Sequence, residues 1–306
     1  MSGSEPAGGW PAGLLSLLAA EAERPVPEDV LRLGAAATAE VGPAALAVLF
    51  YGSALREASV EGKLVDLYVI VDAYERLKDG PLLRRLVRLV PPNVYYLETA
   101  GTAGTVRAKY AVVSLDQLAQ RCGRATENPY FWARFAQPTA ILPGAAPAVR
   151  QRLVAAFAAA SDAVLAKARP LLPQGAPAGE VWGRAFRETY RTELRSEPST
   201  RGFTIYEAAP ARYDAVAALL AGRPPEPGTA RDAMRAWRRR RRMGKLLSVL
   251  RLVKASFTFV GGADYIAWKV ERHSGVKVEL SDWQRRHPLL AAPALLWRLR
   301  RQRAIR

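Results

Sequence analysis

The residues best suited to chemistry lie in one stretch, Leu49 to Asp72, where two apolar runs flank a Gly-Ser pair and an aspartate. The first run ends in Tyr51-Gly52-Ser53, and the second opens on Asp66. Glycine lets the backbone approach a triphosphate because no Cβ stands in the way, and a serine hydroxyl with the amides after it can hold phosphate oxygens. A carboxylate on the adjacent strand can hold the magnesium that bridges those oxygens. The spacing therefore predicts a nucleoside triphosphate and magnesium site.

A second acidic ligand does not follow Asp66 at the usual spacing. Alternate strand residues face the same way, and the position two residues on is Tyr68. Asp72 faces the same side, but six residues of strand place it roughly 20 Å away. We therefore predict that Glu98, at the end of a third expected strand (Asn93 to Leu97), is the second metal ligand.

Composition and charge narrow the class of protein. The chain has 306 residues, 50% of them hydrophobic and 24% charged, which indicates a globular protein with room for two domains. One cysteine and two histidines exclude an internal disulfide and a Cys- or His-rich metal site, and they suit a reducing compartment. The net charge of +17 predicts a polyanionic partner: a nucleotide, nucleic acid or an anionic membrane surface.

Neither a targeting signal nor a membrane span is expected. The start, MSGSEPAGGW, has no basic segment and no long apolar core, and no stretch approaches ~20 uninterrupted apolar residues. We therefore expect a cytoplasmic protein.

The elements that must position the site follow from hydrophobic periodicity and turn residues. Expected helices are Leu14–Ala22, Pro27–Ala37, Pro81–Leu89 and Leu115–Cys122, and expected strands are Ala45–Tyr51, Asp66–Val71, Asn93–Leu97 and Arg107–Ser114. Gly101 to Thr105 is typical of a flexible loop. Near Pro143 the composition shifts to an Ala-rich helical pattern, which predicts a domain over residues 1–143, a helical middle domain over 144–228 and a basic C-terminal region over 229–306.

Three features of the later chain suit contact with anions. Arg134 lies within an aromatic segment, where it needs a partner, and phosphate is a natural bidentate one. Arg231 to Lys254 holds ten basic residues against one acid. Leu295, Leu296 and Leu299 can form one helix face beside Trp297, with arginines around them; such a helix either lies on an anionic membrane or packs on its own protein.

The order of these motifs resembles the mitochondrial-type phosphatidate cytidylyltransferases, also called translocator assembly and maintenance proteins, which have bacterial relatives. The matching segments are Tyr51-Gly52-Ser53-Ala54, Asp66 to Asp72, Lys109-Tyr110-Ala111-Val112, Trp132 to Pro138, and Ser248 to Gly262 with Lys254 at the family's lysine. The chain departs from the family pattern at Ala54, Ala111 and Gln137, where the family has Gly, Gly and Lys.

The resemblance implies a mixed α/β (α+β) fold, in which a nucleotidyltransferase-type sheet domain precedes a helical, winged-helix-like domain. It implies an enzyme that makes CDP-diacylglycerol and pyrophosphate from CTP and phosphatidic acid, on the inner face of the cell membrane as a peripheral protein. Tyr51, Gly52, Ser53, Lys109, Tyr110 and Arg134 would bind the nucleotide, Asp66 and Glu98 would hold magnesium, and Asp66, Lys109 and Lys254 would serve catalysis.

Two alternatives stay open at this point. One keeps the nucleotidyl transfer but changes the acceptor to a protein hydroxyl, a sugar phosphate or an RNA end. The other is a non-enzymatic nucleic-acid-binding protein that uses Arg238 to Arg242, and we rank a nucleic-acid partner last.

Overall fold

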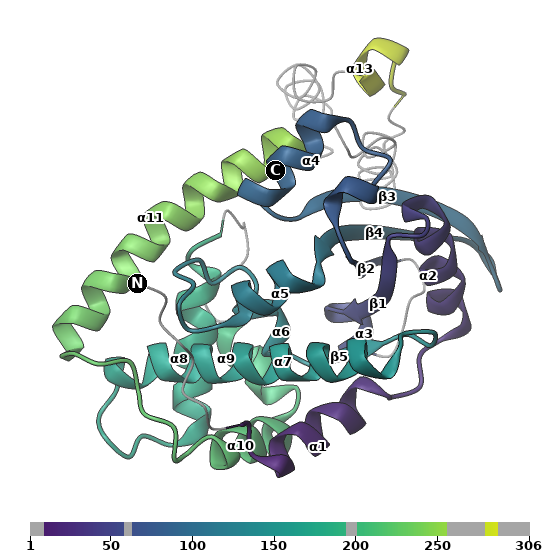
Figure 1. The fold of residues 1–306 in the computed structure, drawn as a ribbon. Helices are drawn as coiled ribbons and strands as arrows, with labels where there is room; N and C mark the ends of the chain where they lie inside the picture. The colour runs from purple at the N-terminus through teal and green to yellow at the C-terminus, as the bar shows by residue number, and fades with distance from the viewer. Residues whose placement is uncertain (1–8, 58–62, 194–200, 256–278, 287–306) are drawn as a thin grey trace.

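A mixed five-stranded sheet, in the order β3-β4-β2-β1-β5, organises the residues that the structure describes (Figure 1). The structure is a computed structural model and describes residues 9–57, 63–193, 201–255 and 279–286, without the side chains of 201–203, 285 and 286. The strands are β1 (Ala45–Tyr51), β2 (Leu64–Val71), β3 (Asn93–Gly101), β4 (Gly104–Ser114) and β5 (Thr139–Ile141). The predicted mixed α/β class is confirmed.

Strand pairing brings the end of β1 beside the start of β2. These two strands are antiparallel with Tyr51 opposite Asp66, whereas β2 and β4 are parallel with Asp66 opposite Lys109. The other neighbours in the sheet pair antiparallel. The β3–β4 connection is a tight hairpin with Gly101 opposite Gly104, so the expected flexible loop at Gly101 to Thr105 is wrong: most of it continues the two strands.

Helices cover both faces of the sheet (Figure 1). The described helices are α1 (Ala12–Ala22), α2 (Glu28–Val41), α3 (Ser53–Arg56), α4 (Pro81–Leu89), α5 (Leu115–Cys122), α6 (Trp132–Phe135), α7 (Pro147–Ala168), α8 (Ala178–Tyr190), α9 (Arg201–Glu207), α10 (Pro210–Leu219), α11 (Ala230–Ala255) and α13 (Asp282–Arg286), with short 3-10 turns η1 (Tyr74–Arg76) and η2 (Arg169–Leu171). On one face, Val30 and Leu33 of α2 join a buried cluster with Phe50 and Val69. On the other face, α1, α5, α6 and α7 cover the sheet.

The strands and α7 are buried because of their composition. From Leu67 to Val71 every residue of β2 is buried, as expected for a central strand with an apolar run and helices on both faces. In α7 the many alanines allow close packing of neighbouring helices, and its second half is almost entirely buried. Its buried charges are paired: Asp162 with Arg124, and Lys167 with Glu226 at 2.8 Å.

One apolar cluster draws on all three predicted domains. It includes Leu49 of β1, Phe157 of α7 and Trp237 of α11, each nearly inaccessible to solvent. The sheet and the later helices therefore share a core, and the boundaries at 143 and 228 stay a prediction. No described helix is long and apolar enough to cross a membrane. The expected helix at Leu295 to Leu299 lies outside the described residues.

Candidate functional site

The site is built where β1 ends and β2 begins, at Tyr51, Gly52, Ser53, Asp66 and Lys109; we call these residues the strand-tip site. Gly52 has φ +91° and ψ −160°, a conformation that is essentially restricted to glycine. A Cβ added to Gly52 would lie 2.9 Å from Asp66 Oδ2. The backbone therefore passes the Asp66 carboxylate at a distance that only glycine allows, whereas the predicted approach of this backbone to a triphosphate stays a prediction.

Asp66 and Lys109 form the charged centre of the strand-tip site. Asp66 Oδ1 lies 2.7 Å from Lys109 Nζ, and these residues face each other across the parallel β2–β4 pair. The side chains are 22% and 41% exposed, so the pair is partly exposed, although the Asp66 Oδ1 atom itself is buried. The Asp66 carboxylate raises the pKa of the Lys109 ammonium, which therefore stays charged at neutral pH.

An aromatic cluster connects the strand tips to α6. Tyr51 and Tyr68 have ring centroids 5.2 Å apart, and Phe135 of α6 lies 5.1 Å from Tyr68. Burial raises the pKa of both tyrosine phenols, so they stay protonated. The positive charges of Arg134 and Lys109 oppose this rise in the pKa of Tyr51.

Arg134 belongs to a cluster of two guanidinium groups and one carboxylate around Tyr130. Its Cζ lies 3.6 Å from the centre of the Tyr130 ring, and Arg251 Cζ of α11 lies 3.8 Å from that centre. Both guanidinium groups therefore lie against the Tyr130 ring. Arg134 Nη1 donates to Glu193 Oε1 at 2.7 Å and to the Tyr130 carbonyl at 2.8 Å. The predicted need for a partner is confirmed, and Glu193 meets it.

Arg56, in the first turn after the Gly-Ser pair, adds a further cation. Its Nη1 donates to Gln137 Oε1 at 3.1 Å, and Gln137 Nε2 donates to the Ala133 carbonyl of α6. Hydrogen bonds at both the oxygen and the nitrogen of its amide therefore hold the Gln137 side chain in one orientation. Where the family pattern has a lysine, this chain has a buried glutamine with an arginine beside it.

Asp66 is the residue of the strand-tip site that could hold a magnesium ion together with the phosphates of a nucleotide. Magnesium is usually held by one or two carboxylates together with phosphates and water. Asp66 Oδ1 is buried and has Lys109 as its partner, with no hydrogen bond to another described residue. No cluster of three or more His, Cys, Asp or Glu side chains suited to a metal occurs in the described part of the chain.

Glu98 is not brought to Asp66. Glu98 lies on β3, which is two strands from β2 in the sheet. In the strand register Glu98 is opposite Arg107, whereas Asp66 is opposite Lys109, two residues further along β4. The two strand spacings and the two-residue shift together place the Glu98 and Asp66 backbones roughly 12 Å apart. Glu98 Oε1 accepts a hydrogen bond from the Tyr96 hydroxyl at 2.6 Å and lies 3.5 Å from Arg107 Nε. A role with Asp66 in one metal site therefore lacks geometric support.

Two further predicted residues lie away from the strand-tip site. Tyr110 follows Lys109 and so faces the other side of the sheet, where it stacks on Tyr95 with ring centroids 5.1 Å apart. Lys254 of α11 is buried, and its Nζ donates to the Val90 carbonyl beside the edge strand β3. Burial lowers the pKa of Lys254 to about 7.

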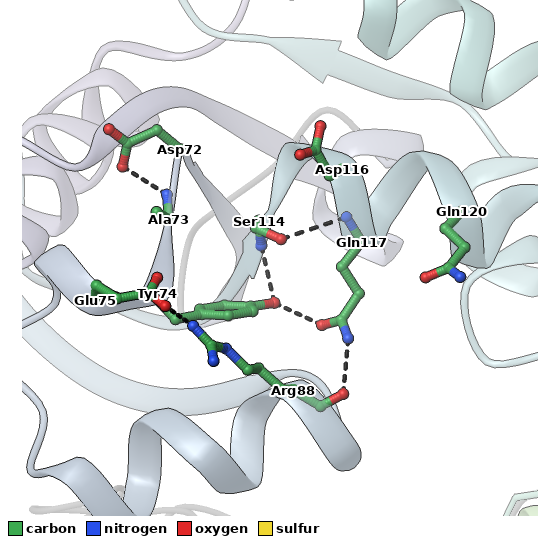
Figure 2. Close-up of a pocket in the computed structure, with 9 residues that line it drawn as sticks. All are labelled: Asp72, Ala73, Tyr74, Glu75, Arg88, Ser114, Asp116, Gln117 and Gln120. Carbon is green, nitrogen blue, oxygen red and sulfur yellow. Dashed lines mark hydrogen bonds and ion pairs between the residues drawn. The ribbon is translucent and has the colours of Figure 1, made fainter.

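A pocket of about 430 Å³ lies at the other end of β2 and β4 (Figure 2). Val71 and Ser114 pair there, five residues or roughly 17 Å along the strands from Asp66. Its acids are already engaged: Asp72 with Arg76, Glu75 with Arg88, and Asp116 with Arg152. The lining holds three carboxylates and one cation, Arg88, so it offers less positive charge to the phosphates of a nucleotide than the strand-tip site does.

Sequence reasoning missed Arg56, Glu193 and Arg251 as parts of the site. Arg56 could have been found, because it lies one turn after the Gly-Ser pair. Arg251 was hidden within a long basic run, and nothing in the sequence around Glu193 connects it with Arg134. In comparisons with known proteins, no family model matches the chain, and no curated protein matches it either.

Proposed function

We propose that this protein is a nucleotidyltransferase that makes CDP-diacylglycerol from CTP and phosphatidic acid. The observation that carries the proposal is the approach of the Gly52 backbone to Asp66, whose carboxylate lies 2.7 Å from Lys109. A backbone without a Cβ, a carboxylate and a cation at one strand end are what binding of a triphosphate with magnesium requires. The resemblance in motif order adds the cytidylyl and lipid specificity, the nucleotidyltransferase-type domain and the winged-helix-like domain.

The reaction needs positioning and charge neutralisation more than acid–base chemistry. Phosphatidate is an anion at neutral pH, so one of its phosphate oxygens can attack the α-phosphorus of CTP without a general base. The new P–O bond forms as the bond from the α-phosphorus to the pyrophosphate oxygen breaks. Ser53 and the Gly52 backbone would seat the phosphates, and Lys109 and Arg134 would neutralise the charge that moves onto the pyrophosphate.

Magnesium would supply further neutralisation of the triphosphate when bound. Asp66 would hold it, and Lys109, which pairs with Asp66 here, would then turn to a phosphate oxygen. Asp66 and Lys109 would then each have a partner of opposite charge both in the presence and in the absence of the nucleotide.

The outward face of α11 supports a lipid acceptor. In its first part this face presents exposed cations: Arg231, Arg235, Arg238, Arg239, Arg242 and Lys245. In its last turns it presents apolar side chains between 44% and 60% exposed: Leu246, Val249, Leu250, Leu252 and Val253. The end of α11 lies beside α4, whose Leu82 and Leu89 are 67% and 71% exposed (Figure 1). Basic and apolar surface in one line suits binding to an anionic membrane.

The arginine run of α11 gives little support to nucleic-acid binding. Within Arg238 to Arg242, Arg240 is buried and pairs with Glu127 and Glu226, and Arg241 pairs with Glu188 at 2.7 Å. Arg239 also pairs with Glu127. Three of the five arginines in this run are therefore paired with carboxylates within the protein, which lowers the net charge that the run offers to a phosphate backbone.

The test is pyrophosphate release from purified protein with magnesium, CTP and liposomes that contain phosphatidate. We expect release only when CTP and phosphatidate are both present, and loss of at least ~100-fold in Asp66→Asn, because removal of a charge that acts in the transition state costs several kcal/mol. The matched control is Asp72→Asn. Asp72 directly follows β2 and pairs with Arg76.

The control variant should keep wild-type turnover. Release with ATP and no lipid would favour another acceptor. Full activity of Asp66→Asn in a folded protein would refute the assignment of the site.

A further inference from the structure

The carboxylate of Glu193 occupies the place at Arg134 that a phosphate would take in the proposed function. Arg134 meets both oxygens of Glu193, with Nη1 2.7 Å from Oε1 and Nη2 3.4 Å from Oε2. This forked geometry is the one that guanidinium groups also adopt with phosphate. Both side chains are 12% exposed, so the pair is buried within the protein beside the aromatic cluster.

The charges around Tyr130 are not balanced by Glu193 alone. Arg134 and Arg251 both lie over the Tyr130 ring, and in the described residues Arg251 makes one hydrogen bond, from Nε to the Pro91 carbonyl at 2.9 Å. Within the described part of the chain, these two guanidinium groups and one carboxylate carry an excess positive charge. A phosphate with two negative charges would balance this cluster better than one carboxylate does.

The backbone of Glu193 is held by the packing of α8 on α11. Glu193 follows α8, and its N–H donates to the Tyr190 carbonyl at 3.1 Å. A Cβ on Gly244 of α11 would lie 2.6 Å from the Thr192 carbonyl oxygen, so only glycine permits this approach. The backbone of Glu193 is therefore fixed, so a release of Arg134 would come from rotation of the Glu193 side chain.

We propose that Glu193 is an internal counter-ion that holds the Arg134 guanidinium until a phosphate group displaces it. The idea depends on the proposed function only for the source of that phosphate, which is either the triphosphate of a nucleotide or the headgroup of phosphatidate. Without ligand, Glu193 keeps a buried guanidinium paired and correctly oriented. With ligand, the Glu193 carboxylate competes with the phosphate for Arg134. Glu193 therefore sets the affinity of the site for phosphate and acts as a specificity-determining positioning residue.

The experiment compares Glu193→Gln with Glu21→Gln as a matched control. Glu21 forms the same kind of buried pair, with Arg212 at 2.8 Å and side chains 9% and 11% exposed, but it connects α1 to α10. Binding of inorganic tripolyphosphate is measured by calorimetry, and binding to phosphatidate vesicles by sedimentation against phosphatidylcholine vesicles. We expect Glu193→Gln to bind one of the two probes roughly tenfold more tightly, because a competing charge is removed.

Each outcome decides the proposal. A gain with tripolyphosphate identifies the nucleotide phosphates as the ligand of Arg134, and a gain with phosphatidate alone identifies the headgroup. The gain must vanish in the double variant Arg134→Gln/Glu193→Gln and be absent in Glu21→Gln. No gain with either probe, or an equal gain in Glu21→Gln, overturns the proposal.

A second variant covers a loss of folding. Glu193→Asp keeps the charge and shortens its reach by one methylene, so it should give a smaller gain of the same sign. Neither binding measurement needs turnover, so failure of the proposed function and failure of the counter-ion role are seen separately. If CTP and phosphatidate are not converted, the binding comparison still decides the role of Glu193; if they are converted and the affinities are unchanged, the role fails alone.

Discussion

Substitution of Gly52 by alanine tests the geometry on which the strand-tip site depends. At φ +91° and ψ −160°, a residue with a side chain is strained by about 1–3 kcal/mol. The new Cβ would also lie 2.9 Å from Asp66 Oδ2 and 3.4 Å from Asp66 Cβ, so the carboxylate must move. Movement would weaken the Asp66–Lys109 pair, which is partly exposed and contributes about 0.2–1 kcal/mol. We expect a total loss of about 1–4 kcal/mol.

Gly144→Ala separates backbone strain from the clash. Gly144 has φ +100°, close to that of Gly52, and a Cβ added there would meet nothing within 4 Å. We expect it to cost about 1–3 kcal/mol without affecting pyrophosphate release. Gly52→Ala should lower release at least ~10-fold, because displacement of a reacting group by less than 1 Å has large effects on rate.

A double-mutant cycle isolates the contact with Asp66. Equilibrium unfolding in urea, followed by tryptophan fluorescence, gives the free energies of unfolding of wild type, Gly52→Ala, Asp66→Ala and the double variant. Asp66→Ala should cost about 0.5–1 kcal/mol less in the Gly52→Ala background than in wild type, because the carboxylate no longer clashes. Strict additivity, together with equal costs for Gly52→Ala and Gly144→Ala, would refute the close approach.

Three further variants test other parts of the structure. Burial lowers the pKa of Lys254 from 10.5 to about 7. Between pH 7 and pH 10.5 the unfolded chain therefore binds up to one proton more than the folded protein. The free energy of unfolding should rise with pH over this range by up to ~1.4 kcal/mol per pH unit. Lys254→Met should flatten this rise in urea titrations from pH 7 to 10; parallel curves for the two proteins would contradict it. Leu250→Glu should weaken binding to phosphatidate vesicles in the sedimentation assay roughly tenfold or more, since burial of a leucine contributes about 1.5–3 kcal/mol. Leu31→Glu changes an exposed leucine of α2 and should leave this binding unchanged. Equal binding by both variants would count against α11 as the membrane surface. Arg56→Gln should raise the KM for CTP about tenfold if its charge replaces the family's lysine at position 137, whereas Arg32→Gln, which removes an exposed arginine paired with Glu28, should leave it unchanged.

Local patterns were sufficient for most elements of the sheet domain. Strand β1 is found from Ala45 to Tyr51 as predicted, and α5 from Leu115 to Cys122. Apolar runs bounded by turn residues favour one conformation over a few residues, and they do so without reference to the remainder of the chain. The same local reasoning placed Gly52 just after one strand and Asp66 near the start of the next, because a Gly-Ser pair and an aspartate bound the two apolar runs.

Pairing across the sheet and between helices settled the remaining questions. The alternation of strand residues means that Lys109 and Tyr110 cannot both face Asp66, and the β2–β4 register selects Lys109. The strand order also separates Glu98 from Asp66, because β3 pairs with β4 and not with β2. The partner of Arg134 depends on contact between residues 59 positions apart, which no local pattern encodes. A sequence records which side chains a segment carries and which way they alternate, whereas the partner of each buried charge depends on how distant segments pack.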